Sequence, residues 1–228
     1  MKKITRLTTS EIVGATLSSL CMGIVMLAVE PAYAAPSAIK VDNNGSSAKN
    51  PGAAWNVFEP VPVGATSVVD TNGTDNGVTV TYSAEWGDSS QTGKEGQFIN
   101  TVFANAADDY FWVKGQTGTV TISGLQNNEL YTVRLCGSNN TGILDADYTV
   151  NGNFGDGSSP ANGSAYNASL DGFTSGVIMT WTGVAPVSGD ITISVAAAGT
   201  GSENYGMLNA FIIEGKFTQP AGTVISIK

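Results

Sequence analysis

The chain has 228 residues, with 19 acidic and 10 basic side chains, a formal net charge of −9 and no histidine. An acidic surface repels phosphate backbones and anionic lipid headgroups, so nucleic acids and membrane surfaces are excluded as preferred partners. The lack of histidine excludes Ser-His and Cys-His nucleophile systems and removes the commonest metal ligand.

The N-terminus has the pattern of a secretory signal peptide, residues 1–34. Basic residues at positions 2, 3 and 6 precede an apolar run over residues 12–29, and Ala32-Tyr33-Ala34 supplies small residues at a cleavage point. The apolar run is close to membrane-spanning length, so an uncleaved anchor is the competing interpretation. With cleavage, we expect no membrane insertion and a secreted protein, extracellular or on the cell surface.

Residues 35–53 are small and polar, and we expect a flexible linker there. Cleavage would leave Cys136 as the sole cysteine, which excludes an intrachain disulfide. A reactive thiol is one interpretation of Cys136; the favoured one is a small apolar residue on a strand.

The stretch DTNGTDNG, Asp70–Gly77, raises the question of a calcium loop. An EF-hand needs an acidic or amide oxygen at its fifth position, glycine at the sixth and glutamate at the twelfth, where this chain has Thr74, Asp75 and Thr81. Asn-Gly pairs at 72–73 and 76–77 instead favour a turn between two strands. A structural calcium site using Asp70, Asn72 and Asp75 is the alternative; no other cofactor is expected.

Apolar and polar residues alternate in short runs beyond this turn, which predicts half-buried strands. Such runs cover residues 77–86, 119–125, 130–138, 176–184 and 190–195. The run 207–215 is apolar on both faces, which predicts a central, fully covered strand. Gly, Asn, Asp and Ser clusters separate the runs. The fold class is therefore predicted to be all-β, an antiparallel β-sandwich or jelly roll.

Several acidic residues lie close together in the sequence: Glu85, Asp88, Glu95 and the pair Asp108-Asp109. Two carboxylates can hydrolyse glycosides, which makes a glycan-active enzyme one hypothesis. Solvated surface acids are the favoured interpretation, and we expect the protein not to be an enzyme.

Aromatic residues beside polar ones carry a different hypothesis. A sugar site needs a ring for stacking and carboxylates or amides for the hydroxyls. Alternation places Tyr110 and Trp112 on one face of a strand and Phe111 on the other, while Trp181, in mid-strand, is assigned to the core. The candidate ligand-binding residues are Trp86, Asp88, Asp109, Tyr110, Asn139, Asn140 and Tyr205. Each aromatic among them has core packing as its competing role.

The order of several short motifs resembles the galactose-binding-like jelly-roll domains of bacterial secreted proteins. The motifs are Gly124-Leu125, Tyr131-Thr132, Gly137-Ser138, Asn167 and the run Tyr205 to Ala210. The resemblance covers most of residues 54–215 and implies a carbohydrate-related β-sandwich. Members often sit beside a catalytic domain, for which this chain has no room.

We therefore expect a β-sandwich domain at 54–215 that binds a glycan or polysaccharide without catalysis. Residues 216–228 form a Pro-Gly hinge and a short β-prone end, predicted to be an edge strand; a strand donated to a neighbour would instead give self-association. The alternative function is a structural cell-surface or extracellular-matrix protein assembled through sheet edges.

Overall fold

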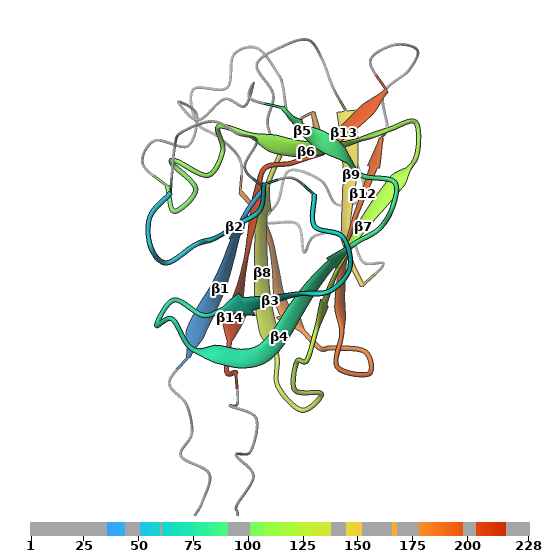
Figure 1. The fold of residues 1–228 in the computed structure, drawn as a ribbon. Coiled ribbons are helices and arrows are strands. Elements are labelled where there is room, and N and C mark those ends of the chain that lie inside the picture. The colour runs from blue at the N-terminus through green and yellow to red at the C-terminus, as the bar shows by residue number, and fades with distance from the viewer. Residues whose placement is uncertain are drawn as a thin grey trace, which may run out of the picture. The chain divides into compact units, whose positions relative to one another are not determined.

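All regular secondary structure in the described residues is β-strand (Figure 1). The computed structural model describes residues 36–43, 51–59, 61–90, 101–137, 145–151, 166–167, 178–197 and 204–217. They belong to one unit, Tyr33–Lys228. Within these ranges no helix has the length and apolar character needed to cross a membrane. The predicted all-β class is confirmed, and the predicted signal peptide lies outside the described residues.

The described strands form three sheets, in which every described pair is antiparallel except β1 with β2. The five-stranded sheet has the order β11 (Met179–Val184), β8 (Tyr131–Cys136), β14 (Ala210–Gly215), β1 (Ser37–Asp42) and β2 (Asn56–Val57). The six-stranded sheet has the order β10 (Tyr166–Asn167), β9 (Asp145–Val150), β12 (Ile191–Ala197), β7 (Thr117–Ser123), β4 (Asp75–Tyr82) and β3 (Thr66–Val69). The three-stranded sheet has the order β13 (Tyr205–Leu208), β6 (Tyr110–Lys114) and β5 (Gly87–Ser90).

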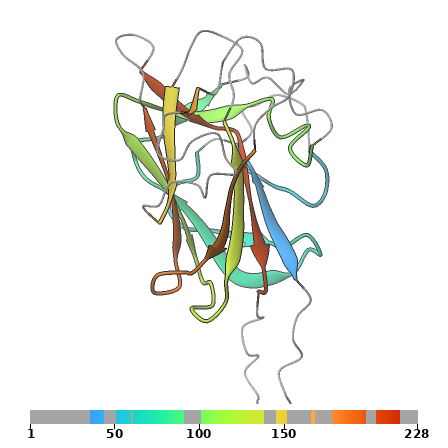
Figure 2. The same ribbon diagram turned by 180° about the vertical axis from the view of Figure 1, so that it is seen from behind.

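The main core lies between the two larger sheets. Alternate residues of the six-stranded sheet, such as Val80, Ile122 and Ile193, are fully buried in one cluster with Val133 and Phe211 of the five-stranded sheet. This alternation buries one face of each strand and leaves the other toward solvent, as in a β-sandwich. Figures 1 and 2 show the two sheets on opposite sides of the molecule.

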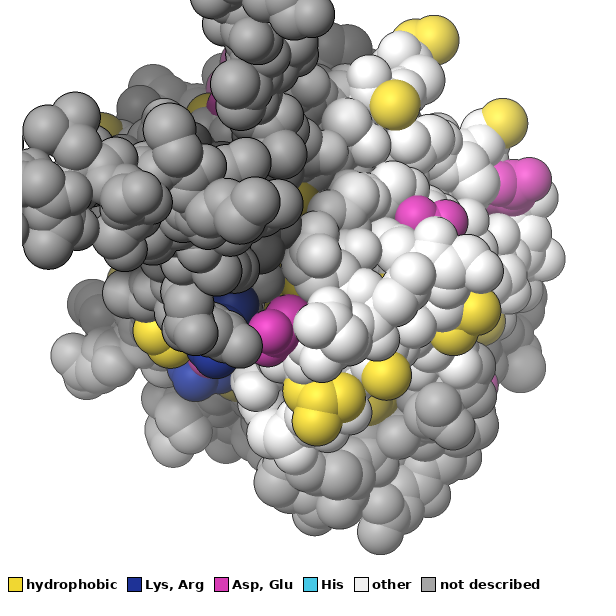
Figure 3. Space-filling model, turned by 90° about the horizontal axis from the view of Figure 1, so that it is seen from below, with side chains coloured by type: hydrophobic (Ala, Val, Ile, Leu, Met, Phe, Trp, Pro, Cys, Tyr) yellow, Lys and Arg dark blue, Asp and Glu magenta, His cyan; other side chains and the backbone are white. Residues whose placement is uncertain are grey.

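The outward face of the six-stranded sheet carries small hydroxyl side chains. Thr81 of β4, Thr121 of β7 and Thr192 of β12 lie in one cross-strand row. Neighbouring rows add the half-buried Thr79, Thr119, Ser123 and Ser194. β-branched threonine packs well on a pleated surface, so this face is explained by strand formation alone. Seen from below, the described surface is mostly white, with charged and hydrophobic side chains in separate spots (Figure 3).

Strand β14 is buried on both faces, as the double-sided apolar run predicted. Phe211 and Ile213 face the main core, whereas Ala210 and Ile212 belong to a second cluster on the other face. The segment Thr101–Asp109 covers that second face through Phe103, Ala106 and Ala107, all buried. Cys136 of β8 is fully buried in the same cluster, as predicted for a small apolar residue on a strand.

A buried asparagine divides the predicted strand 207–215 into two, which corrects that prediction. Asn209 separates β13, in the three-stranded sheet, from β14, in the five-stranded sheet. Its backbone N–H donates to Cys136 O at 3.0 Å, and its side-chain Nδ2 donates to Ala107 O at 3.1 Å. Its carbonyl accepts from the N–H of Asn43 at 2.8 Å. These bonds satisfy polar groups that would otherwise be buried at a cost at the corner.

Two other predictions are also corrected. Residues 37–42, expected in a linker, form β1, because Ile39 and Val41 are fully buried and the strand pairs with β14 over its whole length. The predicted strand 77–86 ends at Tyr82, and a turn precedes β5, so Ala84 is exposed rather than inward. The predicted C-terminal strand, the β-prone end of 216–228, lies outside the described residues, which end at residue 217.

Phe211 is expected to be a main contributor to stability, since it is fully buried at the centre of the core. Replacement of a buried phenylalanine by alanine costs about 3–5 kcal/mol through lost burial and the cavity left behind. Urea denaturation of Phe211→Ala should show this loss. The control is Val63→Ala, at a residue whose side chain is 101% exposed, which should change stability by less than about 0.5 kcal/mol. Equal effects of the two substitutions would contradict the assigned core.

Candidate functional site

Two of the predicted aromatic ligand platforms are core residues. Trp86 is buried, its indole Nε1 donates to Thr119 O at 2.9 Å, and its ring packs edge-on against Tyr82. Tyr110 is also buried in the main core. Neither ring offers an open face for stacking on a sugar, so both predictions are wrong as ligand platforms. The physical reason is that both rings pack within the main core cluster, which the sequence pattern around them does not reveal.

Tyr205 is half-buried and pairs with a second aromatic ring, Trp112. The ring centroids are 5.5 Å apart and the ring planes meet at 74°, an edge-to-face arrangement. Trp112 lies on β6 and Tyr205 on β13, which are hydrogen-bonded neighbours in the three-stranded sheet. Both rings also pack against the main core, which covers the inner side of the pair.

The close approach of Trp112 to β5 requires glycine at position 87. Gly87 is the cross-strand partner of Trp112, and a Cβ built on Gly87 would lie 2.5 Å from the indole ring. The indole therefore rests on the bare backbone of β5. This contact fixes the ring in one orientation without a side chain of β5 between them.

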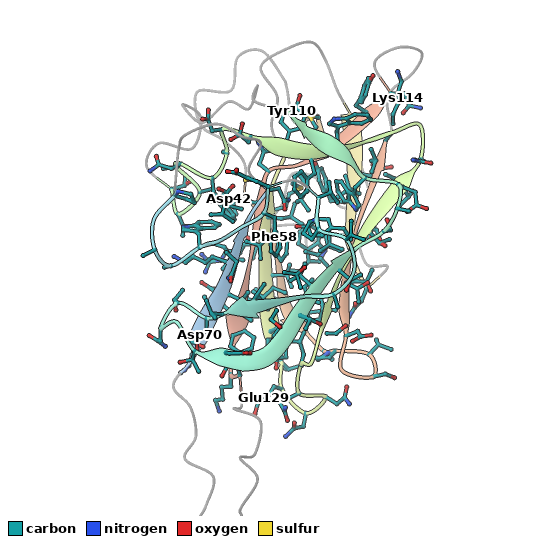
Figure 4. The ribbon with its side chains drawn as sticks, viewed as in Figure 1. Asp42, Phe58, Asp70, Tyr110, Lys114 and Glu129 are labelled. Carbon is teal, nitrogen blue, oxygen red and sulfur yellow. The ribbon has the colours of Figure 1, made fainter. Side chains whose placement is uncertain are left out.

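Lys114 adds a cation to the aromatic pair. It is opposite Tyr205 in the strand register, and its Nζ lies 4.8 Å from the Tyr205 ring centroid, within cation–π range. Figure 4 shows Lys114 at the upper end of the molecule, with its side chain among aromatic sticks. The lysine is exposed, so its ammonium group can also donate hydrogen bonds to a ligand.

The turn after Lys114 is bonded to the residue that precedes Tyr205. Gly115 has φ +65°, which a tight turn requires, and its N–H donates to Asn204 O at 2.9 Å. Next to it, Gln116 Nε2 donates to Glu85 O at 3.2 Å. We define the aromatic site as Trp112, Lys114, Asn204 and Tyr205: an edge-to-face ring pair with an ammonium and an amide beside it.

The remaining predicted ligand residues do not join this site in the described structure. Asp109 is only 2% exposed and lies among buried polar groups, so it cannot meet a ligand at the surface. The side chain of Asp88 and the residues Asn139 and Asn140 lie outside what the structure describes. Trp112 and Lys114 are site residues that the sequence pattern did not identify. Alternation places Trp112 and Tyr110 on the same face of the strand, opposite Phe111, so it does not distinguish the two rings. The sheet partner of β6 does distinguish them.

The stretch at Asp70 is a turn, as predicted, and it closes on its own carboxylate. Asp70 Oδ1 accepts from the N–H groups of Asn72 and Thr74 at 2.8 and 3.0 Å, and Oδ2 accepts from Asn76 Nδ2 at 3.1 Å. Asp75 Oδ1 accepts from Gly77 N–H at 2.8 Å. Both carboxylates are thus used by the backbone of the loop. The Asn76-Gly77 pair lies within β4 and not in the turn.

These bonds change the acidity of Asp70. Burial raises its pKa, but the hydrogen bonds from Thr74, Asn72, Asn76 and Ser37 together outweigh burial and lower the pKa below its usual value. Across the described residues, no three acidic, cysteine or histidine side chains are grouped as a metal site. Asp70, Asn72 and Asp75 are therefore explained by the turn, and calcium binding by them stays a prediction without geometric support.

No protein-family model and no curated protein matches the sequence. Among solved structures, the ANXUR1 extracellular domain from Arabidopsis thaliana is similar over 60% of this chain and 43% of that one, with 14% identity and a TM-score of 0.43. An exo-β-1,3-galactanase from Phanerochaete chrysosporium, solved with galactose, matches over 59% of this chain and 29% of that one, at 19% identity and a TM-score of 0.29.

A Ruminococcus gnavus GH29 fucosidase in complex with fucose matches over 64% of this chain and 26% of that one, with 16% identity and a TM-score of 0.27. The chain thus spans less than half the length of each of these proteins. Because every TM-score is below 0.5, these likenesses decide neither the fold family nor a function.

Asp70→Ala should destabilise the protein by about 1–3 kcal/mol at neutral pH, because the part-buried N–H groups of Asn72 and Thr74 lose their charged acceptor. Since the folded pKa of Asp70 is lowered, its stabilisation is present above the unfolded pKa and is lost as pH falls through the folded value. Chemical denaturation should therefore show the two proteins converging in acid.

In a separate thermal denaturation experiment, the melting temperature of the unmodified protein in excess calcium is compared with that in chelator. Equal values are expected if the turn is closed by Asp70 alone. A rise with calcium that Asp70→Ala abolishes would overturn this account of the loop.

Proposed function

We propose that the protein is a non-catalytic carbohydrate-binding β-sandwich of the galactose-binding-like type, and that it binds a glycan at the aromatic site. The observation that carries this proposal is the half-buried Trp112–Tyr205 pair with Lys114 over the tyrosine ring. Sugar rings have apolar faces and hydroxyl rims, so a fixed aromatic surface beside hydrogen-bond donors is suited to them.

The arrangement of the site supports binding of a neutral or acidic sugar rather than a basic one. Lys114 places a positive charge on a chain whose net charge is −9, and it lies directly over a ring. An ammonium group can donate to sugar hydroxyls and attracts carboxylated sugars. The half-buried side chain of Asn204 supplies amide groups that can donate and accept.

The described aromatic site contains no carboxylate, which is why we propose binding without hydrolysis. Glycoside hydrolysis needs two carboxyl groups across the scissile bond. Asp109, one member of the acidic pair predicted from the sequence, is buried away from the surface. Localisation outside the cell follows from the predicted signal peptide and is part of the proposal.

The proposal is tested by binding of the full chain to a glycan array and to insoluble polysaccharides. Against the best glycan, Tyr205→Ala and Trp112→Ala should each weaken affinity at least about tenfold, equivalent to the loss of one stacking contact of about 1.4 kcal/mol. Trp55→Ala is the matched control, since Trp55 is also half-buried and also lies under a lysine, Lys40, but on another part of the fold.

Four outcomes decide the proposal. Weaker binding by the Tyr205 and Trp112 variants, with the Trp55 variant unchanged, supports it. Binding that all three variants retain would place the glycan elsewhere, and no binding across both panels by folded protein would reject a carbohydrate function. Release of reducing sugar from a bound polysaccharide would contradict the non-catalytic assignment.

A further inference from the structure

A buried carboxyl group, Asp42, lies beneath the segment Thr101–Asp109. Asp42 is the last residue of β1 and is only 2% exposed. It pairs with Ala210, which pairs in turn with Cys136, so the three residues form one row across β1, β14 and β8. Ala210 and Cys136 are covered by the segment. Figure 4 places Asp42 in the upper part of the molecule, at the end of the five-stranded sheet.

The charged groups that act most strongly on Asp42 are acidic. Asp109 and Asp108 come from the end of the covering segment, and Glu59 follows β2. From β4, the buried Tyr82 hydroxyl donates to Asn43, the residue after Asp42. From β8, the buried Cys136 thiol interacts electrostatically with Asp42. Lys40, two residues earlier on β1, has its Nζ 5.5 Å from the Trp55 ring centroid.

This environment favours the protonated form of Asp42. Burial, followed by the charges of Asp109, Asp108 and Glu59, raises its pKa from 3.8 to about 8. In the folded chain Asp42 therefore keeps its proton at pH values where an exposed carboxyl has lost it. The sign follows from linkage: the contribution of Asp42 to stability is greatest below pH 3.8 and falls as pH rises to about 8.

The segment Thr101–Asp109 takes part in none of the described strand pairings, so its opening would break no pairing of the sheets. It contains no strand, and Phe103, Ala106 and Ala107 are its buried contacts with β14 and β8. The side chain of Asn209 donates a hydrogen bond to this segment, at Ala107 O. Local opening of such a segment costs less free energy than opening a paired strand. Its last residue, Asp109, carries one of the charges that face Asp42.

We propose that Asp42 is a proton-operated latch: with its proton, the segment Thr101–Asp109 stays closed on the five-stranded sheet, and loss of that proton favours an open form that uncovers Cys136. In the open form Asp42 reaches water and separates from Asp109, so ionisation stabilises opening. The closed form excludes water from Asp42, Asp109 and the thiol together.

Hydrogen exchange with mass spectrometry on the full chain tests the latch directly. After correction for the intrinsic effect of pH on exchange, the opening constant of residues 101–109 should rise about tenfold for each pH unit between pH 5 and pH 7 and flatten above pH 8, because opening releases one proton in that range. In Asp42→Asn, which keeps the shape of the protonated carboxyl, the opening constant should not depend on pH.

The matched control is Glu129→Gln, at the opposite end of the molecule in Figure 4, which should retain the pH profile of the unmodified chain. Asp109→Asn removes one neighbouring charge and should move the plateau to lower pH. Alkylation of Cys136, followed by peptide mass spectrometry, should be faster in the unmodified chain than in Asp42→Asn at pH 7.

A flat profile in the unmodified chain would overturn the latch, and that result does not depend on whether any variant folds. An equal slope in Asp42→Asn would assign the pH dependence to another group. These outcomes are independent of glycan binding, because no sugar is present in the experiment.

Discussion

The corner at Asn209 is the constraint on which the arrangement of this protein depends. A continuous apolar run enters the three-stranded sheet as β13 and leaves in the five-stranded sheet as β14. The change of sheet leaves buried backbone groups without partners from strand pairing, and two asparagines supply hydrogen-bond partners. Asn209 donates to Cys136 O and Ala107 O, and Asn43 donates to Leu208 O. An apolar residue at position 209 would leave Ala107 O without that donor.

The corner also holds together the two regions to which we assign properties. On one side, β13 continues to Tyr205 and pairs with β6, which places Tyr205 against Trp112. On the other side, Asn209 donates a hydrogen bond to Ala107 O in the closed segment Thr101–Asp109, which covers Cys136. A strand that changes sheets thus gives the fold a ring pair on a short separate sheet and a buried acidic group at the sheet junction.

Much of the fold could be predicted from the sequence because strand periodicity is local. Alternation located the strands that contain Val120, Val133 and Ile193, and the Asn-Gly pair at 72–73 located the turn after Asp70. The sequence did not predict β1, because a six-residue strand flanked by polar residues has a weak pattern and is stabilised by β14 at the far end of the chain. The division of residues 207–215 was missed for a similar reason, since an asparagine in a strand reveals nothing about its distant partners.

The site was harder to predict than the fold. Trp86 follows Glu85 and Tyr110 follows Asp109 in the sequence, whereas Trp112 lies between two apolar residues. The exposure of each ring is decided by which strands cover it. Tyr110 is covered, whereas Trp112 lies over the bare backbone of Gly87, on a strand 25 residues earlier in the sequence. Asp109 and Asp42 are 67 residues apart, so their effect on one another has no local signal in the sequence.

The most direct measurement of the central claim is a titration of the indole N–H resonances of the four tryptophans with the best-bound glycan. The account predicts that the Trp112 resonance shifts and saturates with the binding curve. Trp86, whose N–H is bonded to Thr119 O, and the buried Trp181 should stay in place. Saturating shifts at Trp55 with none at Trp112 would contradict the account, because the glycan would then bind on a different part of the fold.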